Sequence, residues 1–349
     1  MKKISVLIVD DSKTMTALLR VIFDDTADIS VIGCAEDGEQ AVMMTQQLKP
    51  NVVIMDIMMP KMNGFEATQK IMETCPTPVI ILSSLVSSEK MQSTYKALLM
   101  GALAALPKFT GVMTDDFDMK QQAFLEQIRM LSDVRLVPRH KRENKTSLVK
   151  KALVQPVKIL GLGVSTGGPE ALTTIVSSLD RTFPAPIVAV LHISNGFLEG
   201  LVQWLQKRTT LTLKIASHQE ALLPGTLYFA PDNYHLMVQQ GVQPRAILKD
   251  EPPMGYFKPA IAALFSSLAV AYPGECMAGL LTGMGSDGVD GLAAMKEVGC
   301  YTFVQSEATC VVAGMTHAAK KMGVVDDEVD LDQIAVFLKM LVQQKKDES

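Results

Sequence analysis

The sequence predicts two successive α/β domains, each built on a doubly wound and mainly parallel sheet. Three observations support this expectation. The chain has 349 residues, a length that suits two hydrophobic cores rather than one. Hydrophobic residues make up 48% and charged residues 20%, which is enough apolar material for both cores. Short apolar runs alternate with longer helix-like stretches in both halves, as in repeated β-α units.

The first domain contains five short apolar runs, each followed by a stretch with helical spacing. These runs are residues 4–9, 29–34, 52–55, 79–82 and 102–106. Five β-α units in the first third of the chain predict a flavodoxin-like sheet. The last predicted helix carries one apolar stripe, which should pack on the sheet. The stripe consists of Phe117, Phe124, Ile128 and Leu131.

Residues 135–156 separate the two predicted domains. This segment has seven basic side chains and one acidic side chain, and it lacks periodicity. It is expected to be a basic linker, either a solvated tether or a docking strip for an acidic partner. The predicted domains are therefore residues 1–125, with a last helix that runs to about 134, and residues 157–349.

Strand-like runs return in the second domain and predict another doubly wound sheet. They are residues 157–163, 187–191, 211–215, 276–281 and 300–304. Between 225 and 248, the segments TLYFA and HLMVQ alternate in polarity and are separated by turn residues. This pattern predicts an antiparallel hairpin insertion.

Composition argues against several functional classes. Residues 1–134 carry 12 basic and 17 acidic side chains, and residues 157–349 carry 14 and 19, so neither part is suited to bind nucleic acid. The five cysteines form no C-x-x-C pair, which argues against a zinc site or disulfide framework and favours a reducing cytosol. The apolar start is too short for a signal peptide, and no stretch is long enough to span a membrane. We therefore expect a cytoplasmic protein with no direct membrane insertion.

Acidic side chains follow two predicted strands of the first domain. Asp10 and Asp11 follow the first strand, and Asp56 follows the third. Because ligands of open α/β sheets bind at the carboxyl ends of the strands, these carboxylates should converge. Three neighbouring carboxylates need a cation, and Mg²⁺ suits two or three such oxygens. The sequence therefore predicts a magnesium site.

Two further polar residues follow the fourth and fifth strands. Ser83 offers a hydroxyl and Lys108 an ammonium, and both suit a phosphoryl group. An aspartate that accepts phosphate forms a mixed anhydride, so metal and lysine would neutralise the phosphoryl oxygens around Asp56. Each residue has a simpler alternative as a helix cap, a loop residue or a surface cation. Their joint placement at strand ends favours the phosphoryl site.

A possible nucleophile follows the first strand of the second domain. The segment GVSTGGP over residues 163–169 matches G-x-S-x-G and leads into a helical run, with Pro169 in its first turn. A serine on such a strand-to-helix turn exposes its hydroxyl, and free N–H groups at the helix start can stabilise an oxyanion. Ser165 is therefore the candidate nucleophile.

A dinucleotide-binding loop is the rival interpretation of the same segment. Gly161, Gly163 and Gly167 approximate a phosphate-binding turn, but the G-x-G-x-x-G spacing fails at Thr166. No tyrosine has a lysine four residues later, as the looser dehydrogenase pattern would require. The spacing favours the serine motif.

A serine nucleophile needs an imidazole base and an acid that orients it. His192 ends the strand that follows the serine's helix, so it should emerge at the same sheet edge as Ser165. The other histidines after Ser165 are less well placed: His218, His235 and His317. Asp287 lies in the glycine-rich loop after strand 276–281 and is the candidate acid, with a plain helix cap as its alternative. The fallback acids are Asp290 and Asp232.

Residues 1–125 resemble the receiver domain of two-component response regulators. The resemblance is carried by LIVDDS, VVIMDIMMPKMNG, VIILSS and LPK. It implies phosphotransfer from a histidine kinase to Asp56, with Mg²⁺ held by Asp10, Asp11, Asp56 and the backbone carbonyl of Met58.

Residues 157–330 resemble the catalytic domain of the chemotaxis receptor methylesterase family, CheB, which is also a glutamine deamidase. The resemblance is carried by STGGPEAL, LPGTLYFAPDNYHL, LLTGMGSDG and QSEATCVVAGM. It implies an α/β domain of hydrolase type in which Ser165 is the nucleophile, His192 the base and Asp287 the acid. Thr166 and Met284 fall in its active-site loop.

The two resemblances together imply a hydrolase activated by phosphorylation. Its expected substrates are methyl-accepting chemotaxis receptors, from which it would remove glutamate methyl esters and glutamine amides without a cofactor of its own. The resemblance also implies that the unphosphorylated receiver covers the entrance to Ser165. The alternative is a signalling adaptor with a receiver and a weakened or inactive hydrolase domain.

Several positions depart from the family patterns. Ala105 stands where receivers often carry an aromatic switch residue, and Phe109 replaces the proline that usually follows the lysine. In the second domain, family members usually have His-Met-Pro after the base's strand and Arg-Pro-Ser-x-Asp before a later helix. Here the corresponding changes are Ser194, Lys258, Ala260 and Ala262. Lysine lacks the bidentate hydrogen bonding of arginine, so these changes bear on substrate choice or rate.

Overall fold

The structure is a computed structural model that describes residues 3–84, 88–109, 117–134, 136 and 156–343. The chain divides into two compact units, Met1–Arg139 and His140–Ser349. Most of the predicted linker, 135 and 137–155, lies outside the described residues. No described helix is long and apolar enough to cross a membrane.

The first unit contains a five-stranded parallel sheet with the order β2-β1-β3-β4-β5. Its strands are β1 (Ile4–Val9), β2 (Ile29–Ala35), β3 (Val52–Asp56), β4 (Val79–Ser83) and β5 (Ala104–Pro107). Its helices are α1 (Lys13–Asp24), α2 (Gly38–Leu48), α3 (Gly64–Thr74), α4 (Ser88–Leu99) and α5 (Phe117–Ser132). The order confirms the predicted flavodoxin-like fold.

Local sequence explains where these helices begin and how the last one packs. Ser12 and Asp37 cap α1 and α2 with their side-chain oxygens, and Asn63 forms a capping box with the third residue of α3. Most of the predicted stripe on α5 is buried, since Phe124, Ile128 and Leu131 are at most 4% exposed. The stripe therefore joins the core of the unit.

The second unit contains a seven-stranded parallel sheet with the order β14-β13-β12-β6-β7-β9-β8. Its strands are β6 (Ile159–Val164), β7 (Ile187–Leu191), β8 (Thr212–Ile215), β9 (Thr226–Phe229), β12 (Cys276–Leu280), β13 (Tyr301–Gln305) and β14 (Asp327–Val329). Its helices are α6 (Gly168–Ser177), α7 (Leu198–Gln206), α8 (Ile261–Ala271), α9 (Val289–Glu297), α10 (Gly314–Met322) and α11 (Ile334–Gln343), with the 3-10 turn η1 (Leu331–Gln333).

The second unit also contains an antiparallel hairpin of β10 (His235–Gln239) and β11 (Arg245–Lys249), which confirms that a hairpin is inserted here. The prediction that the TLYF run belongs to this hairpin was wrong. The TLYF run, β9, pairs in parallel with β7 and β8 inside the main sheet. All four of its residues are buried, as in a parallel strand that is covered on both faces. In the sequence, a run this short does not distinguish a buried parallel strand from one strand of a hairpin. The three-residue strand β14 was not predicted.

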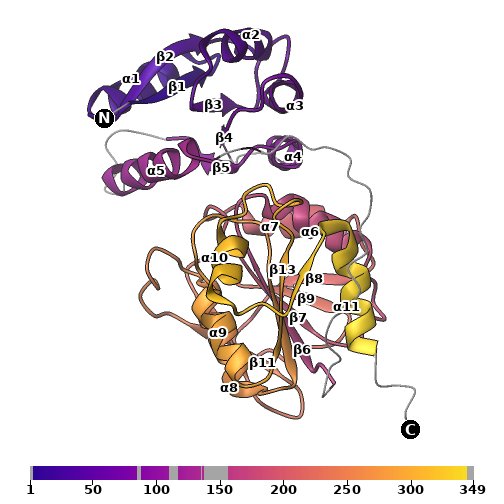
Figure 1. The fold of residues 1–349 in the computed structure, drawn as a ribbon. Helices are drawn as coiled ribbons and strands as arrows, with labels where there is room; N and C mark the ends of the chain where they lie inside the picture. The colour runs from indigo at the N-terminus through magenta and orange to yellow at the C-terminus, as the bar shows by residue number, and fades with distance from the viewer. Residues whose placement is uncertain (1–2, 85–87, 110–116, 135, 137–155, 344–349) are drawn as a thin grey trace. The chain divides into compact units, whose positions relative to one another are not determined.

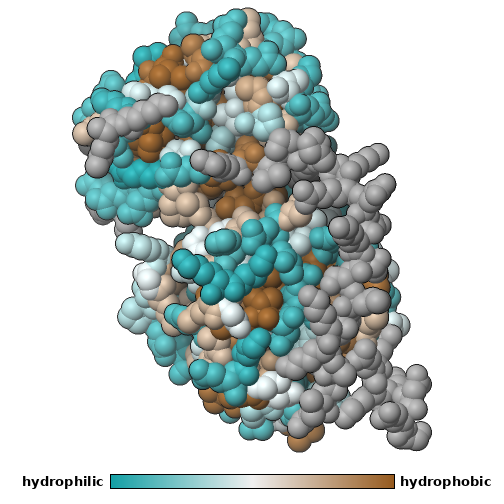
Figure 2. Space-filling view, viewed as in Figure 1, coloured by the Kyte–Doolittle hydropathy of each residue, from teal (hydrophilic) through white to brown (hydrophobic). Residues whose placement is uncertain are grey.

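Helices cover both faces of the larger sheet (Figure 1). Helices α8, α9 and α10 pack on one face together with the hairpin, and α6, α7 and α11 lie on the other. On the side shown in Figure 2, both units carry a mixture of hydrophilic and hydrophobic residues, and hydrophilic ones are prominent. Because β12, β6 and β7 are neighbours, the loops after these three strands emerge side by side.

Candidate functional site

Strand register brings Ser165 and His192 together. Val164 pairs with Leu191 at the ends of β6 and β7, so Ser165 and His192 are the next residues on neighbouring strands. The His192 N–H donates to the Val164 carbonyl at 2.9 Å, and the Ser165 N–H donates to the Thr282 carbonyl after β12 at 3.1 Å. Parallel strands lie about 4.8 Å apart, so three loops meet around Ser165.

Glycines allow the loops to approach this closely. Gly167 has a φ of +82°, and a Cβ there would lie 2.6 Å from Cβ of Val311. A Cβ at Gly283 would lie 2.6 Å from Cβ of Ser165. The turn itself is closed by a hydrogen bond of 2.8 Å from the Gly168 N–H to the Ser165 carbonyl. A side chain at Gly283 would therefore displace the candidate nucleophile, and one at Gly167 would push against Val311 in a neighbouring loop.

His192 and Asp287 form the core of the site. Nε2 of His192 lies 3.0 Å from Oδ2 of Asp287, and both side chains are nearly buried. This approach is not aligned for a hydrogen bond, and neither ring nitrogen of His192 has a well-aligned partner among the described residues. The imidazole also stacks on Phe257, with ring centres 4.2 Å apart and planes 7° apart. Both ring nitrogens are thus buried, and Nε2 is the one that faces Asp287.

Asp287 also caps a helix. Its Oδ2 accepts the Ile261 N–H at 2.7 Å, and its Oδ1 accepts the Ala262 N–H at 3.0 Å. Burial raises the pKa of Asp287, but His192 and the two backbone N–H groups together outweigh burial and hold it below its usual value. The helix-cap alternative is thus correct as geometry, although the capped helix is α8 rather than the following α9.

The other candidate histidines and acids have different partners. His235 is buried and bonded to backbone at both ring nitrogens, with Pro252 and Ala260. The remaining candidates contact residues other than His192. His218 accepts from the Leu248 N–H, His317 lies near Glu307, Asp232 accepts from the Gly196 N–H, and Asp290 is exposed on α9.

Thr282 connects the loops, and sequence reasoning did not single it out. Its hydroxyl donates to the Thr166 carbonyl at 2.9 Å and accepts the Val312 N–H at 3.1 Å, while its own N–H donates to the Gln305 side chain at 3.0 Å. Within the described ranges no hydrogen bond from the Thr166 N–H is found. Met284 lies half-buried in the same loop. Thr282 and Gln305 belong to family motifs, but spacing alone did not indicate these contacts.

Three of the four positions that depart from the family pattern lie at or just before the start of α8, and the fourth, Ser194, lies in the loop after His192. Nζ of Lys258 lies 2.6 Å from Oδ1 of Asp250. Ala260 is the N-cap residue of α8 and offers no side-chain acceptor. Ala262 donates its N–H to Asp287, and the Ser194 carbonyl accepts a backbone hydrogen bond in the loop after His192. None of these four residues interrupts the contact between His192 and Asp287.

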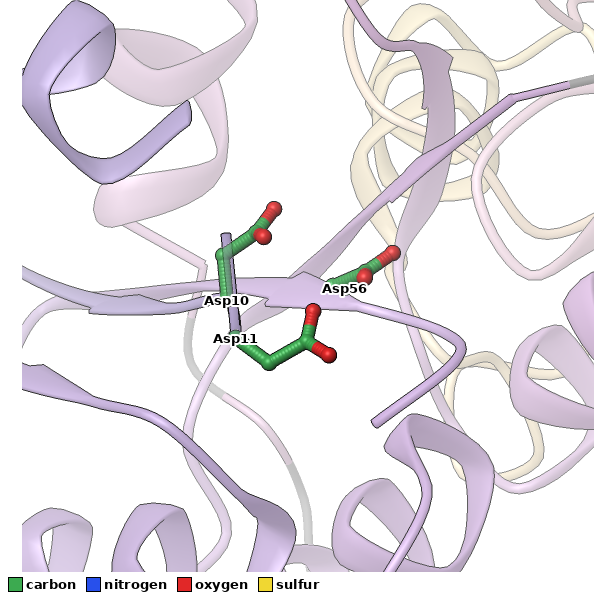
Figure 3. A group of neighbouring side chains, drawn as sticks. All are labelled: Asp10, Asp11 and Asp56. Atoms are coloured by element: carbon green, nitrogen blue, oxygen red, sulfur yellow. The ribbon is translucent and has the colours of Figure 1, made fainter. Parts of the chain in front are cut away.

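The first unit has a second cluster, at the carboxyl edge of its sheet. Asp10, Asp11 and Asp56 offer carboxylate oxygens that all lie within 4.8 Å of one another. Figure 3 shows the three side chains gathered after β1 and at the end of β3. Nζ of Lys108 lies 2.8 Å from Oδ2 of Asp10 and 2.9 Å from Oδ2 of Asp56. The donor set fits a hard divalent cation.

Burial and charge shape this cluster. Burial raises the pKa of Asp56 despite the opposing effect of Lys108. Burial alone would lower the pKa of Lys108, but Asp10 and Asp56 outweigh it and raise the pKa. The ionised form of Asp56 is therefore disfavoured even beside Lys108, and a further cation at this edge would favour it.

The other predicted residues of the first unit have their own surroundings. Ser83 is buried at the end of β4, where its hydroxyl accepts from Thr94 at 2.9 Å. Met58 follows Asp56 by two residues and is 40% exposed. Ala105 is buried in β5, and Phe109 packs against aromatic rings of α5.

Comparison with known proteins first defines the class. Residues 6–112 match the family described as response regulator receiver domain, and residues 160–338 match the family described as CheB methylesterase. The chain is therefore a response regulator whose output unit is an α/β unit of hydrolase type. It belongs to the CheB methylesterase family.

Full-length relatives support the same assignment. A protein-glutamate methylesterase/protein-glutamine glutaminase of Nitrosospira multiformis is 40% identical over 98% of both chains. One of Geobacter metallireducens is 37% identical over 98% of this chain and all of the relative. The crystal structure of the Thermotoga maritima CheB methylesterase catalytic domain is 34% identical, with a TM-score of 0.52, and covers 53% of this chain and 99% of that one. These names favour the enzyme over the adaptor alternative.

Proposed function

We propose that this chain is a protein-glutamate methylesterase, with protein-glutamine glutaminase as a second activity, and that phosphorylation of Asp56 activates it. One observation carries the catalytic part of the proposal. Neighbouring strands bring Ser165 and His192 into register, and Asp287 lies 3.0 Å from the His192 ring. This is the set of groups that acyl transfer requires.

Acylation begins when Ser165 Oγ attacks the carbonyl of the glutamyl methyl ester while His192 takes its proton. The Thr166 N–H stabilises the resulting oxyanion. Asp287 remains ionised and orients the imidazolium. The tetrahedral intermediate collapses, methanol leaves with the proton from His192, and an acyl-serine remains.

Deacylation repeats the same proton transfers with water. His192 takes a proton from water, the hydroxide attacks the acyl-serine, and Ser165 leaves with the proton. The product is a glutamate carboxylate. With a glutamine amide the same steps release ammonia in place of methanol.

Asp56 accepts a phosphoryl group from a histidine kinase in this proposal. Asp10, Asp11, Asp56 and the backbone carbonyl of Met58 would hold Mg²⁺, which supplies positive charge to the phosphoryl oxygens. Lys108 and the Ser83 hydroxyl would contact the phosphoryl group once it is attached. The substrates are methyl-accepting chemotaxis receptors, and the reaction takes place in the cytoplasm.

The decisive experiment measures methanol release from methylated chemotaxis receptors in matched bacterial membranes. We expect release with the wild-type protein and none above background with Ser165→Ala. Hydrolysis of a small aryl ester without methanol release from receptors would reject the substrate and keep the hydrolase. Loss of both activities would favour the adaptor.

A further inference from the structure

A tight turn stands beside the candidate base. The Met254 N–H donates to the Phe257 carbonyl at 3.1 Å, and the Phe257 N–H donates to the Met254 carbonyl at 3.2 Å. Gly255 has a φ of +62° and open space where a Cβ would stand. Tyr256 is consequently displayed at the tip and is 89% exposed, and Met254 is 47% exposed.

His235 holds the segment that carries this turn. Its Nδ1 accepts the Ala260 N–H at 3.1 Å, so Nε2 bears the proton and donates to the Pro252 carbonyl at 3.0 Å. Lys258 pairs with Asp250 across the same segment. The buried His235 side chain therefore holds the backbone both before the turn, at Pro252, and after it, at Ala260. These two contacts preorganise the turn.

The inner side of the turn fixes the imidazole plane. Phe257 stacks on His192 with ring centres 4.2 Å apart, whereas the ring nitrogens lack a well-aligned hydrogen bond. Face-to-face packing thus restrains the plane of the ring, while Nε2 at its edge lies in ion-pair range of Asp287. A cation within about 6 Å of an aromatic face is also stabilised, so the imidazolium formed during catalysis would benefit.

The outer side of the turn presents a large, exposed aromatic side chain one residue before Phe257. Successive Cα atoms are about 3.8 Å apart, so Tyr256 begins one residue away from the ring that touches His192. Tyrosine and methionine are enriched in protein interfaces, where tyrosine often contributes strongly to affinity. A substrate side chain bound to Ser165 would bring its own polypeptide toward Tyr256.

We propose that the turn Met254–Phe257 is a two-sided element of the substrate site. Phe257 is a positioning residue for His192, and Tyr256 with Met254 contacts the helical polypeptide that carries the glutamyl ester. This inference rests on the proposed function, because it takes the substrate to be a protein. The inner side of the turn positions the catalytic base, and the outer side binds the substrate polypeptide.

Tyr256→Ala tests the outer side. With methylated receptor membranes we expect KM to rise about tenfold at unchanged kcat, the change that corresponds to about 1.4 kcal/mol. Turnover of a small aryl ester should stay at the wild-type level. Val336→Ala, which shortens an exposed apolar side chain on α11, is the control and should alter neither. An unchanged KM for receptors with Tyr256→Ala would overturn this half.

Phe257→Leu and Phe257→Tyr test the inner side. Leucine keeps the site apolar but removes the aromatic face, so kcat should fall for both substrates. The acid limb of the kcat/KM profile should move to lower pH by about half a unit to one unit, because the imidazolium loses a stabilising contact. Tyrosine should restore both. Among the residues that the structure describes, Asp287 is the charged group in ion-pair range of the ring, and it is unchanged in both variants.

The outcomes separate this inference from the proposed function. If wild-type protein hydrolyses the aryl ester but releases no methanol from receptors, the proposed substrate is wrong, and the Phe257 variants still test the positioning role. If wild-type protein releases methanol and Phe257→Leu leaves the pH profile in place, the positioning role is wrong.

Discussion

Oδ2 of Asp287 lies 3.0 Å from Nε2 of His192 and accepts the Ile261 N–H at 2.7 Å. One carboxylate therefore lies beside the candidate base and caps helix α8, whose N-cap residue Ala260 has no side-chain acceptor. The helix dipole and the imidazole both favour the ionised form. In the proposed mechanism, catalysis and the start of α8 depend on the same side chain, and Asp287→Asn should separate the two roles.

Asp287→Asn should lower turnover about 10³- to 10⁴-fold, because an amide can favour the wrong imidazole tautomer. The amide oxygen can still accept a backbone N–H, so we expect the fold to be retained by circular dichroism. Asp290→Asn, an exposed neighbour on α9, is the matched control and should keep full turnover. Wild-type turnover in Asp287→Asn would remove Asp287 from the mechanism.

The low pKa of Asp287 predicts how its contribution to stability varies with pH. A carboxyl whose pKa is lower in the folded state stabilises the fold above its unfolded pKa of about 3.9, and this is lost as pH falls through the folded pKa. The free energy of unfolding of wild type should therefore exceed that of Asp287→Asn at pH 7, and the gap should close below about pH 4. Urea titrations followed by Trp204, buried in the same unit, measure this. A gap that widens on acidification would contradict it.

Ser165→Ala and His192→Ala should each lower turnover about as much as the double variant. The two groups act in one proton transfer, so removing either abolishes the step. Rates of aryl ester hydrolysis by the three variants give the comparison. Additive losses would mean that Ser165 and His192 do not act together.

Asp56→Asn should prevent phosphorylation by a small phosphodonor in the presence of Mg²⁺, because an amide cannot form the acyl phosphate. Chelation of Mg²⁺ should prevent it in the wild-type protein as well. Incorporation of labelled phosphate measures both effects. Persistent label in Asp56→Asn would indicate another acceptor, such as Asp11.

Phosphorylation should raise esterase turnover of the full-length chain. The family resemblance implies that the unphosphorylated receiver inhibits the hydrolase by covering the entrance to Ser165. A shift of the population from mostly covered to mostly open needs roughly 3 to 5 kcal/mol. A fragment that begins at Val157 should be faster than the unphosphorylated full-length protein. Equal rates for the fragment and the unphosphorylated chain would show that the receiver does not occlude the site.

The sequence by itself determined the two α/β folds and most of the candidate residues. Apolar runs mark strands, and the carboxyl ends of parallel strands share one sheet edge, so residues placed after those runs must converge. Asp10, Asp56, Ser165 and His192 were located in this way. Strand register then placed Asp10 beside Asp56 in the first unit and Ser165 beside His192 in the second. Local patterning is sufficient when strand direction alone sets the geometry.

Only the tertiary structure decided which loops meet and what each contact does. The β9 run entered the main sheet because both its faces are covered, which a four-residue pattern does not encode. His235 holds the segment before α8, Phe257 stacks on His192, and Asp287 caps a helix that begins 26 residues earlier in the chain. These contacts join segments distant in sequence. The periodicity of apolar residues predicts which face of a helix or strand is buried. Which segments then contact one another depends on the packing of the whole unit.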